Sequence, residues 1–290
     1  MKRLFAILLA ATTFAAHADI TGAGATFPYP IYAKWAEAYK KETGIGLNYQ
    51  SIGSSGGIRQ INNKTVTFGA SDAPVAGAEL DKLAQVQFPA IIGGTVPIVN
   101  LEGFKPGELR ITGTVLAEVF LGEIAKWNDP KLAALNPGKK LPDLEITIVH
   151  RADGSGTTFN WTDYLATVST EWLQRVGRGA AVKWPAANSV GGKGNEGVAA
   201  MVRQLPGTLG YVEFAYVKQT KMNWVNVQNA AGTWVAPTEE AFKAAAANAD
   251  WNRTYFQILT NQAGQQAWPI SGATFILVYL KPEDAAKSKT

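Results

Sequence analysis

The chain has 290 residues, of which 27 are Lys or Arg and 23 are Asp or Glu, and it contains no cysteine. The lack of cysteine excludes disulfides, thiolate catalysis and Cys-ligated metals. The formal charge of +4, with no basic run or stripe, argues against a nucleic-acid partner, while 47% hydrophobic residues are ample for a sizeable core.

The first eighteen residues have the pattern of a secretory signal peptide. Lys2 and Arg3 precede an apolar run over residues 4–16, and Ala16-His17-Ala18 fits an A-x-A cleavage site. We therefore predict export to the periplasm and a mature chain of 290 − 18 = 272 residues with a net charge of 25 − 23 = +2. No later run approaches the roughly 20 apolar residues of a membrane span. The mature length favours two lobes over a single domain.

Three short strands, each followed by a loop of small polar residues, are predicted in the first ninety residues. The strands lie near residues 20–24, 47–52 and 66–71, and helices are expected around 31–41, 58–62 and 78–86. In open α/β sheets, ligands bind where the carboxyl ends of the strands and their loops gather. One such loop is weak evidence, but three in succession favour a ligand site.

The middle of the chain continues the alternation of strands and helices. A long β-like run at 88–100 is predicted to leave one lobe and enter a second. Further elements are expected in the order helix, strand, helix, helix, helix, strand, at 116–121, 144–150, 159–168, 170–176, 196–204 and 210–213.

The last part of the chain is predicted to return to the first lobe. Residues 224–227 alternate and are expected to make this crossing, followed by a helix at 237–247 and a buried strand at 274–280. The resulting prediction is an α/β clamp of two lobes with a hinge: residues 19–92, 93–222 and 223–290 form, in turn, the first lobe, the second lobe and the rest of the first.

The segment 151–158 is the clearest candidate for an anion site. It follows the predicted strand at 144–150 and runs through Gly154, Ser155 and Gly156 into a helix. Free N–H groups and the positive end of the helix dipole attract anions at such a junction, and Arg151 adds a planar charged fork. An ordinary capped helix with a surface arginine is the alternative for this segment taken alone.

Eight motifs, in order along nearly the whole mature chain, make it resemble the periplasmic phosphate-binding proteins of bacterial phosphate ABC transporters. Each motif is ordinary alone, but the set is specific: Gly22–Pro28, Gly53–Gly57, Phe68–Pro74, Arg151–Thr157, Gly191–Asn195, Leu205–Gly207, Gly210–Glu213 and Trp268–Ile270. The resemblance implies a type II periplasmic-binding-protein fold and phosphate held between the lobes by hydrogen bonds alone, with no metal and no cofactor. It also implies a monomer that delivers phosphate to permease subunits in the inner membrane, powered by a cytoplasmic ATPase.

The resemblance also implies the site residues. Arg151 would grip two phosphate oxygens while Asp153 holds its guanidinium in place, and Asp72 would be the one acceptor. The donors would be backbone N–H groups and hydroxyls of Ala25, Thr26, Phe27, Ser54, Ser155, Gly156 and Thr157.

Asp72 carries the expected specificity. A carboxylate repels an anion unless that anion has a proton to donate, as mono- and dibasic phosphate do and sulfate at neutral pH does not. Facing sulfate, Asp72 would remain unpaired at a cost of at least ~1–3 kcal/mol. The alternative is that Asp72 only forms the turn before Ala73 and Pro74.

Two departures from the family pattern leave every ligand position present, but the first is expected to bear on stability and lobe closure. The C-terminus is predicted to be short for the family, because relatives continue past the strand at 274–280. His150 stands where the family often has a second arginine, but in an extended segment it and Arg151 point to opposite faces.

Three other functions remain open at this stage. A different tetrahedral oxyanion such as sulfate could be the ligand, and a secreted adhesion or matrix protein could reuse the fold. A phosphatase-like enzyme is the third. His150 is the one histidine of the mature chain and is expected to point away from the loop, which argues against Ser-His-Asp catalysis, and the scattered acidic residues argue against a catalytic metal site. We therefore predict a binding protein and no catalysis.

Overall fold

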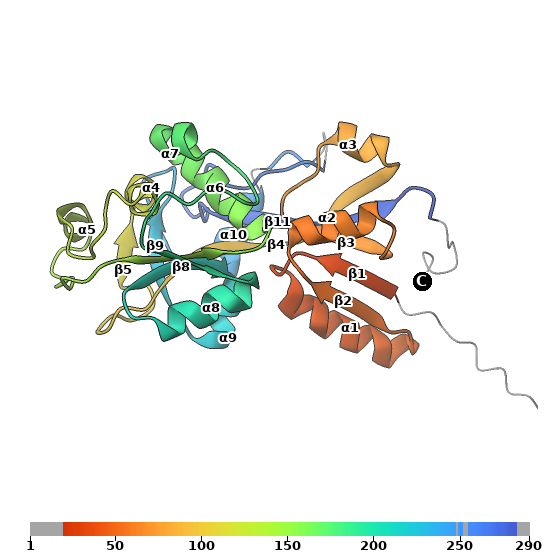
Figure 1. The fold of residues 1–290 in the computed structure, drawn as a ribbon, viewed down its shortest axis with the longest axis horizontal. Helices are drawn as coiled ribbons and strands as arrows, with labels where there is room; N and C mark the ends of the chain where they lie inside the picture. Colours follow the sequence, from red (N-terminus) through yellow and green to blue (C-terminus); the bar gives the residue numbers. More distant parts are fainter. Residues whose placement is uncertain (1–19, 248, 252–254, 283–290) are drawn as a thin grey trace, which may run out of the picture.

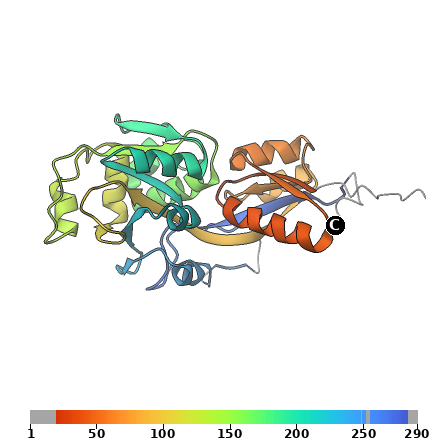
Figure 2. The same ribbon diagram turned by 90° about the horizontal axis from the view of Figure 1, so that it is seen from below.

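The computed structural model describes residues 20–247, 249–251 and 255–282 (Figure 1). Within them the strands form one continuous sheet in the order β2-β1-β3-β11-β4-β8-β6-β7. Figures 1 and 2 show two lobes joined at the middle of this sheet, where β4 and β11 lie side by side. The predicted signal peptide at 1–18 and the last eight residues lie outside the described residues.

The first lobe is built on three parallel strands. β1 (Ile20–Gly24) lies between β2 (Leu47–Ser51) and β3 (Phe68–Ser71). Helices α1 (Tyr29–Thr43) and α2 (Ser54–Asn62) lie on opposite sides of these strands in Figure 1, and α3 (Gly77–Lys82) follows β3. The sequence predicted helices at 58–62 and 78–86, so α2 starts earlier and α3 ends earlier than expected.

Close packing explains why α2 starts before its two glycines and runs through them. A Cβ atom on Gly57 would lie 2.5 Å from both the Ala23 oxygen and the Gly24 Cα, so only glycine lets the helix approach β1 this closely. The helix-breaking tendency of Gly56 and Gly57 is thereby overridden by tertiary contact.

A single long strand carries the chain from one lobe to the other. β4 (Gln85–Val99) pairs with β11 over residues 85–94 and with β8 over residues 95–99. The predicted crossing at 88–100 is therefore confirmed, and the boundary expected at 92/93 falls inside this strand.

The second lobe continues the sheet beyond β4. β8 (Thr208–Glu213) pairs with β4, and β6 (Thr147–Arg151) lies parallel to both β8 and β7 (Ser189–Gly192). The lobe also contains helices α4 (Gly113–Leu121), α5 (Pro130–Leu135), α6 (Gly156–Val168), α7 (Thr170–Arg175), α8 (Gly194–Gln204), α9 (Phe214–Thr220) and α10 (Glu239–Ala247).

The return to the first lobe differs from the prediction. Residues 224–227 belong to β9 (Asn223–Gln228), which pairs with β5 (Leu109–Ile111), with β10 (Trp234–Val235) and with the second-lobe end of β4. The crossing is made instead by β11 (Ser271–Tyr279), which pairs with β4 and β3. Val225 and Val227 are buried in the core of the second lobe, which holds β9 there.

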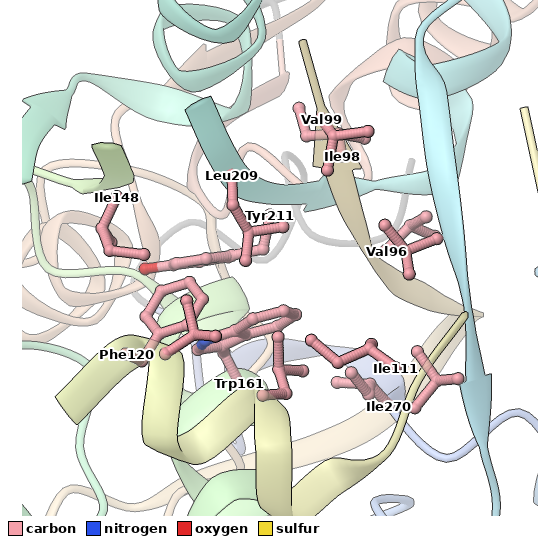
Figure 3. Packing of buried hydrophobic residues seen from close by; sticks show 14 of the residues in the cluster. Val96, Ile98, Val99, Ile111, Phe120, Ile148, Trp161, Leu209, Tyr211 and Ile270 are labelled. Atoms are coloured by element: carbon pink, nitrogen blue, oxygen red, sulfur yellow. The ribbon is translucent and has the colours of Figure 1, made fainter. Parts of the chain in front are cut away.

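Most of the buried apolar volume lies in the second lobe. Figure 3 shows the rings of Trp161 and Tyr211 stacked, with Phe120 lying beside them. The centroids of the two stacked rings are 4.7 Å apart. The first lobe has a much smaller cluster around Ala23, Ile61 and Leu277. The second lobe therefore provides a rigid base from which β6 and α6 present Arg151 and the loop after it.

Candidate functional site

The polar loops of the two lobes meet directly. The Gly156 N–H donates to the Ser54 Oγ at 3.0 Å, and the Ser55 N–H donates to the Gly154 oxygen at 3.1 Å. Ser54 and Ser55 begin α2 in the first lobe, while Gly154 and Gly156 follow β6 in the second. Residues a hundred positions apart in the sequence are thus brought together where the two lobes meet.

Arg151 is a buried cation at this site, and Asp153 holds it by a two-point contact. Nε donates to Oδ1 at 2.8 Å and Nη2 donates to Oδ2 at 2.5 Å, while Nη1 donates to the Thr157 Oγ1 at 3.3 Å. Three of the five guanidinium N–H groups are used, so two remain for an anion. The Arg151 side chain is only 1% exposed, so the fork is held rigidly.

The charge of Arg151 also acts on its partner. Burial alone would raise the pKa of Asp153, but the hydrogen bonds and charge of Arg151, with the Gly194 N–H, lower it below its usual value. Asp153 is therefore ionised at neutral pH and offsets the charge of Arg151. An anion bound here would be held chiefly by oriented N–H and O–H dipoles.

Asp72 is a buried carboxylate with one oxygen in use. The Thr274 hydroxyl donates to Oδ1 at 2.6 Å, whereas Oδ2 has no hydrogen-bond partner in the described part of the chain. Burial raises the pKa of Asp72 to about 7, although the Thr274 hydrogen bond, the charge of Arg151 and the nearby Ser54 hydroxyl oppose this rise. Oδ2 is therefore a buried acceptor suited to a ligand that brings its own proton.

Helix starts supply donors on both sides. Ser155 is the N-cap of α6, where its Oγ accepts from the Thr158 N–H at 3.0 Å, so the hydroxyl proton can be donated elsewhere. The N–H groups of Thr26 and Phe27, just before α1, donate to no other residue that the structure describes. These N–H and hydroxyl groups remain available to a ligand.

The prediction is wrong for the Ala25 amide. Its N–H donates to the Ala70 oxygen at 2.9 Å, because β1 and β3 continue their parallel pairing one residue beyond Gly24. Ala25 therefore shapes the loop and presents no free N–H group. The backbone N–H groups of Ser155 and Gly156 are likewise taken, by the Ala180 oxygen and the Ser54 Oγ, so Ser155 keeps only its hydroxyl as a donor and the prediction of Gly156 as a donor is wrong.

His150 does not take part in the site. Its ring stacks on Trp184, with centroids 4.9 Å apart, and burial lowers the pKa of the imidazole. The different surroundings of His150 and Arg151 agree with the predicted alternation along β6. Among the described residues no cluster of three or more His, Cys, Asp or Glu side chains could hold a metal ion.

Three residues of this region were not predicted as site residues. Thr274 reaches Asp72 from β11, Glu213 is buried at the end of β8, and Asn195 contacts threonines of both lobes. Asn195 and Glu213 lie in motifs that the sequence singled out. Asn195 and its partner Thr26 are 169 positions apart, however, and no local sequence pattern indicates such a contact.

The fold and the interlobe site define a solute-binding protein of the periplasmic-binding-protein class. A family model described as the PBP superfamily domain matches residues 10–288. The phosphate-binding protein PstS of Pasteurella multocida is 55% identical over 287 residues, which cover 97% of this chain and 83% of that protein. PstS of Haemophilus influenzae is 54% identical over 279 residues, which cover 96% of this chain and 83% of that protein. The chain therefore belongs to the PstS family of phosphate-binding proteins.

Solved structures agree on the fold. A putative phosphate ABC transporter substrate-binding protein from Clostridium perfringens, with bound phosphate, superposes with a TM-score of 0.67 at 18% identity, covering 94% of this chain and 90% of that one. The phosphate-bound periplasmic protein PfluDING gives a TM-score of 0.70 at 21% identity, covering 94% of this chain and 83% of that one.

Proposed function

We propose that this chain binds inorganic phosphate between its two lobes and delivers it to an ABC-type importer in the inner membrane. The observation that carries the proposal is Asp72, a buried carboxylate whose Oδ2 is unpaired among the described residues. It interacts electrostatically with Arg151. A proton-bearing oxyanion satisfies both groups at once.

The phosphate ligands in this proposal follow from the free groups. Arg151 donates its two remaining N–H groups to the phosphate. Further donors are side-chain hydroxyls, those of Thr26, Ser54, Ser155 and Thr157. The remaining donors are backbone N–H groups, those of Thr26, Phe27 and Thr157. Gly156 brings the start of α6 against the first lobe, and Asp153 keeps the guanidinium in position. Asp72 accepts the ligand's proton through Oδ2.

The hinge of the proposed clamp consists of the two strands that join the lobes, β4 and β11. Opening would separate Ser54 from Gly156 and Ser55 from Gly154, so the ligand enters between surfaces that meet when the lobes close. In this proposal the protein works as an exported, periplasmic monomer. Among the described residues no helix is both long and apolar enough to cross a bilayer.

Sulfate is the closest alternative ligand, and it lacks the proton that Oδ2 of Asp72 needs. A phosphatase would need a base near a nucleophile, whereas the His150 ring is stacked on Trp184. The family is one of solute-binding proteins, which supports a function without catalysis.

Isothermal titration calorimetry of the purified protein, freed of phosphate by partial unfolding and dialysis, tests the proposal. We expect one phosphate per chain with submicromolar affinity, and no detectable heat with sulfate at pH 8. Equal affinity for the two anions, or release of phosphate from p-nitrophenyl phosphate, would contradict the proposal.

A further inference from the structure

A single side chain of the second lobe joins the two lobes at the site. Asn195 lies in the first turn of α8 and is 0% exposed. Its Nδ2 donates to the Thr26 Oγ1 at 2.6 Å and to the Thr157 Oγ1 at 3.2 Å. Thr26 belongs to the first lobe and Thr157 to the second, so one amide group touches a hydroxyl from each.

The orientation of this amide is set by the backbone. The Glu213 N–H donates to the Asn195 Oδ1 at 2.9 Å, so Oδ1 must face Glu213. The reverse orientation would place the Nδ2 hydrogens against that N–H. Both Nδ2 hydrogens therefore point toward the threonines, and the threonine oxygens act as acceptors in these two contacts.

The two hydroxyls therefore act only as acceptors toward Asn195 and Arg151. The Thr26 Oγ1 accepts from the side chain of Asn195 and also from its backbone N–H at 3.2 Å. The Thr157 Oγ1 accepts from the Nη1 of Arg151 as well as from Asn195. A hydroxyl has two acceptor lone pairs and one proton, so each threonine keeps its proton for a further acceptor.

We propose that Asn195 is a positioning residue for the anion site: it holds the lobes together through Thr26 and turns the hydroxyl protons of Thr26 and Thr157 toward the bound oxyanion. This inference rests on the proposed function, because the acceptor of both protons is the phosphate. Asn195 itself does not contact the ligand. Its role depends on having two donor hydrogens on one nitrogen, which distinguishes the amide from a carboxylate of the same shape.

Asn195→Asp is the decisive variant. An ionised aspartate accepts hydrogen bonds only, so both hydroxyls would turn their protons away from the phosphate. It would also face the Glu213 N–H as before, which preserves the contact that orients the side chain. We expect phosphate affinity to fall at least about 10-fold at pH 8.5, which is the lower bound for losing a single hydrogen bond to a charged group.

The pH dependence separates this role from a loss of structure. Protonation of the carboxyl group that Asn195→Asp introduces restores one donor hydrogen, so the ratio of variant to wild-type Kd for phosphate should shrink several-fold between pH 8.5 and pH 5.5. Asn136→Asp makes the same chemical change at another buried asparagine of the second lobe, and its Kd ratio should stay near one at both pH values.

A second pair of variants covers the case in which Asn195→Asp does not fold. Asn195→Ala should weaken phosphate binding at least fivefold in the wild-type background. In a Thr26→Val/Thr157→Val background, where no hydroxyl remains to be oriented, the same change should cost less than twofold.

Three results would overturn the inference. They are an Asn195→Asp affinity within threefold of wild type at pH 8.5, a loss that does not change with pH, or an Asn195→Ala loss that is equal in the two backgrounds. If the wild type fails to bind phosphate in the first titration, both the proposed function and this inference are overturned. If the wild type binds phosphate and one of the three results above is found, only the inference about Asn195 is overturned.

Discussion

Replacing Asp72 by asparagine isolates the part that one buried charge plays in choosing between phosphate and sulfate. The amide has nearly the size of the carboxylate, and its oxygen can still accept from the Thr274 hydroxyl. The change therefore places an NH₂ group where the unpaired Oδ2 lies and leaves the neighbouring contacts in place. The substitution thus replaces the unpaired acceptor Oδ2 of Asp72 with the donor NH₂ group of an amide.

The size of the effect follows from two separate terms. Phosphate loses a hydrogen bond to a charged acceptor, worth about 1.5–3 kcal/mol, which corresponds to roughly a 10- to 150-fold weaker Kd. Sulfate no longer leaves the Oδ2 acceptor unpaired, a cost of about 1–3 kcal/mol, whereas the like-charge repulsion by Asp72 acts on both dianions at pH 8.5 and cancels from the comparison. The two terms add to at least about 2.5 kcal/mol, so the preference for phosphate over sulfate should fall by roughly 70-fold or more.

Titration calorimetry with both anions at pH 8.5 measures this preference, because Asp72, with its pKa raised to about 7, is ionised there. Asp163→Asn is the control: Asp163 is another buried carboxylate, which interacts with Arg178 and Thr260, and its loss should leave the ratio unchanged. In the wild type, sulfate binding should also strengthen as the pH falls below 7. A phosphate-to-sulfate preference that survives Asp72→Asn would refute the assignment of Oδ2 as the discriminating acceptor.

Three further predictions concern the neighbours of Asp72 and the pH dependence of stability. Asp153→Asn breaks the contact with the buried guanidinium of Arg151, so urea denaturation should show a free energy of unfolding lower by about 3 kcal/mol, and an unchanged midpoint would contradict this role. Gly156→Ala would place a Cβ 2.5 Å from the Asp72 Cβ, so the lobes could not close fully; calorimetry should show weaker phosphate binding, and wild-type affinity would disprove the clash. Burial raises the pKa of Asp72 to about 7 and that of Glu213 to about 8, so the folded state holds these protons more tightly than the unfolded state does. The resulting stability is complete below about pH 4 and is lost as the pH rises through 7 to 8. The phosphate-free protein should therefore melt at a lower temperature at pH 9 than at pH 6, and this difference in melting temperature should be smaller in Glu213→Gln. A melting temperature that rises over this range would contradict the sign.

Much of the fold could be predicted because its signals are local. Alternating apolar residues indicated β2 and β6, and the long apolar run at 88–100 indicated the crossing strand β4. The boundaries of α2 and the partner of β9 could not be predicted in this way. The former depends on how closely the glycines approach β1, and the latter on which apolar core receives Val225 and Val227.

The sequence by itself determined the residue types of the site: an arginine followed by an aspartate two positions later, small polar loops at strand ends, and an aspartate before a proline turn. These patterns indicate an anion because their chemistry is carried by residues close together in the chain. What only the tertiary structure decided is which groups are already engaged. The Ala25 N–H is taken by Ala70, one oxygen of Asp72 is held by Thr274 from 202 positions away, and the Asn195 amide orients hydroxyls from both lobes. A hydrogen bond uses up a donor or an acceptor whatever the distance along the chain, so the free groups of a site are known only once the lobes are packed.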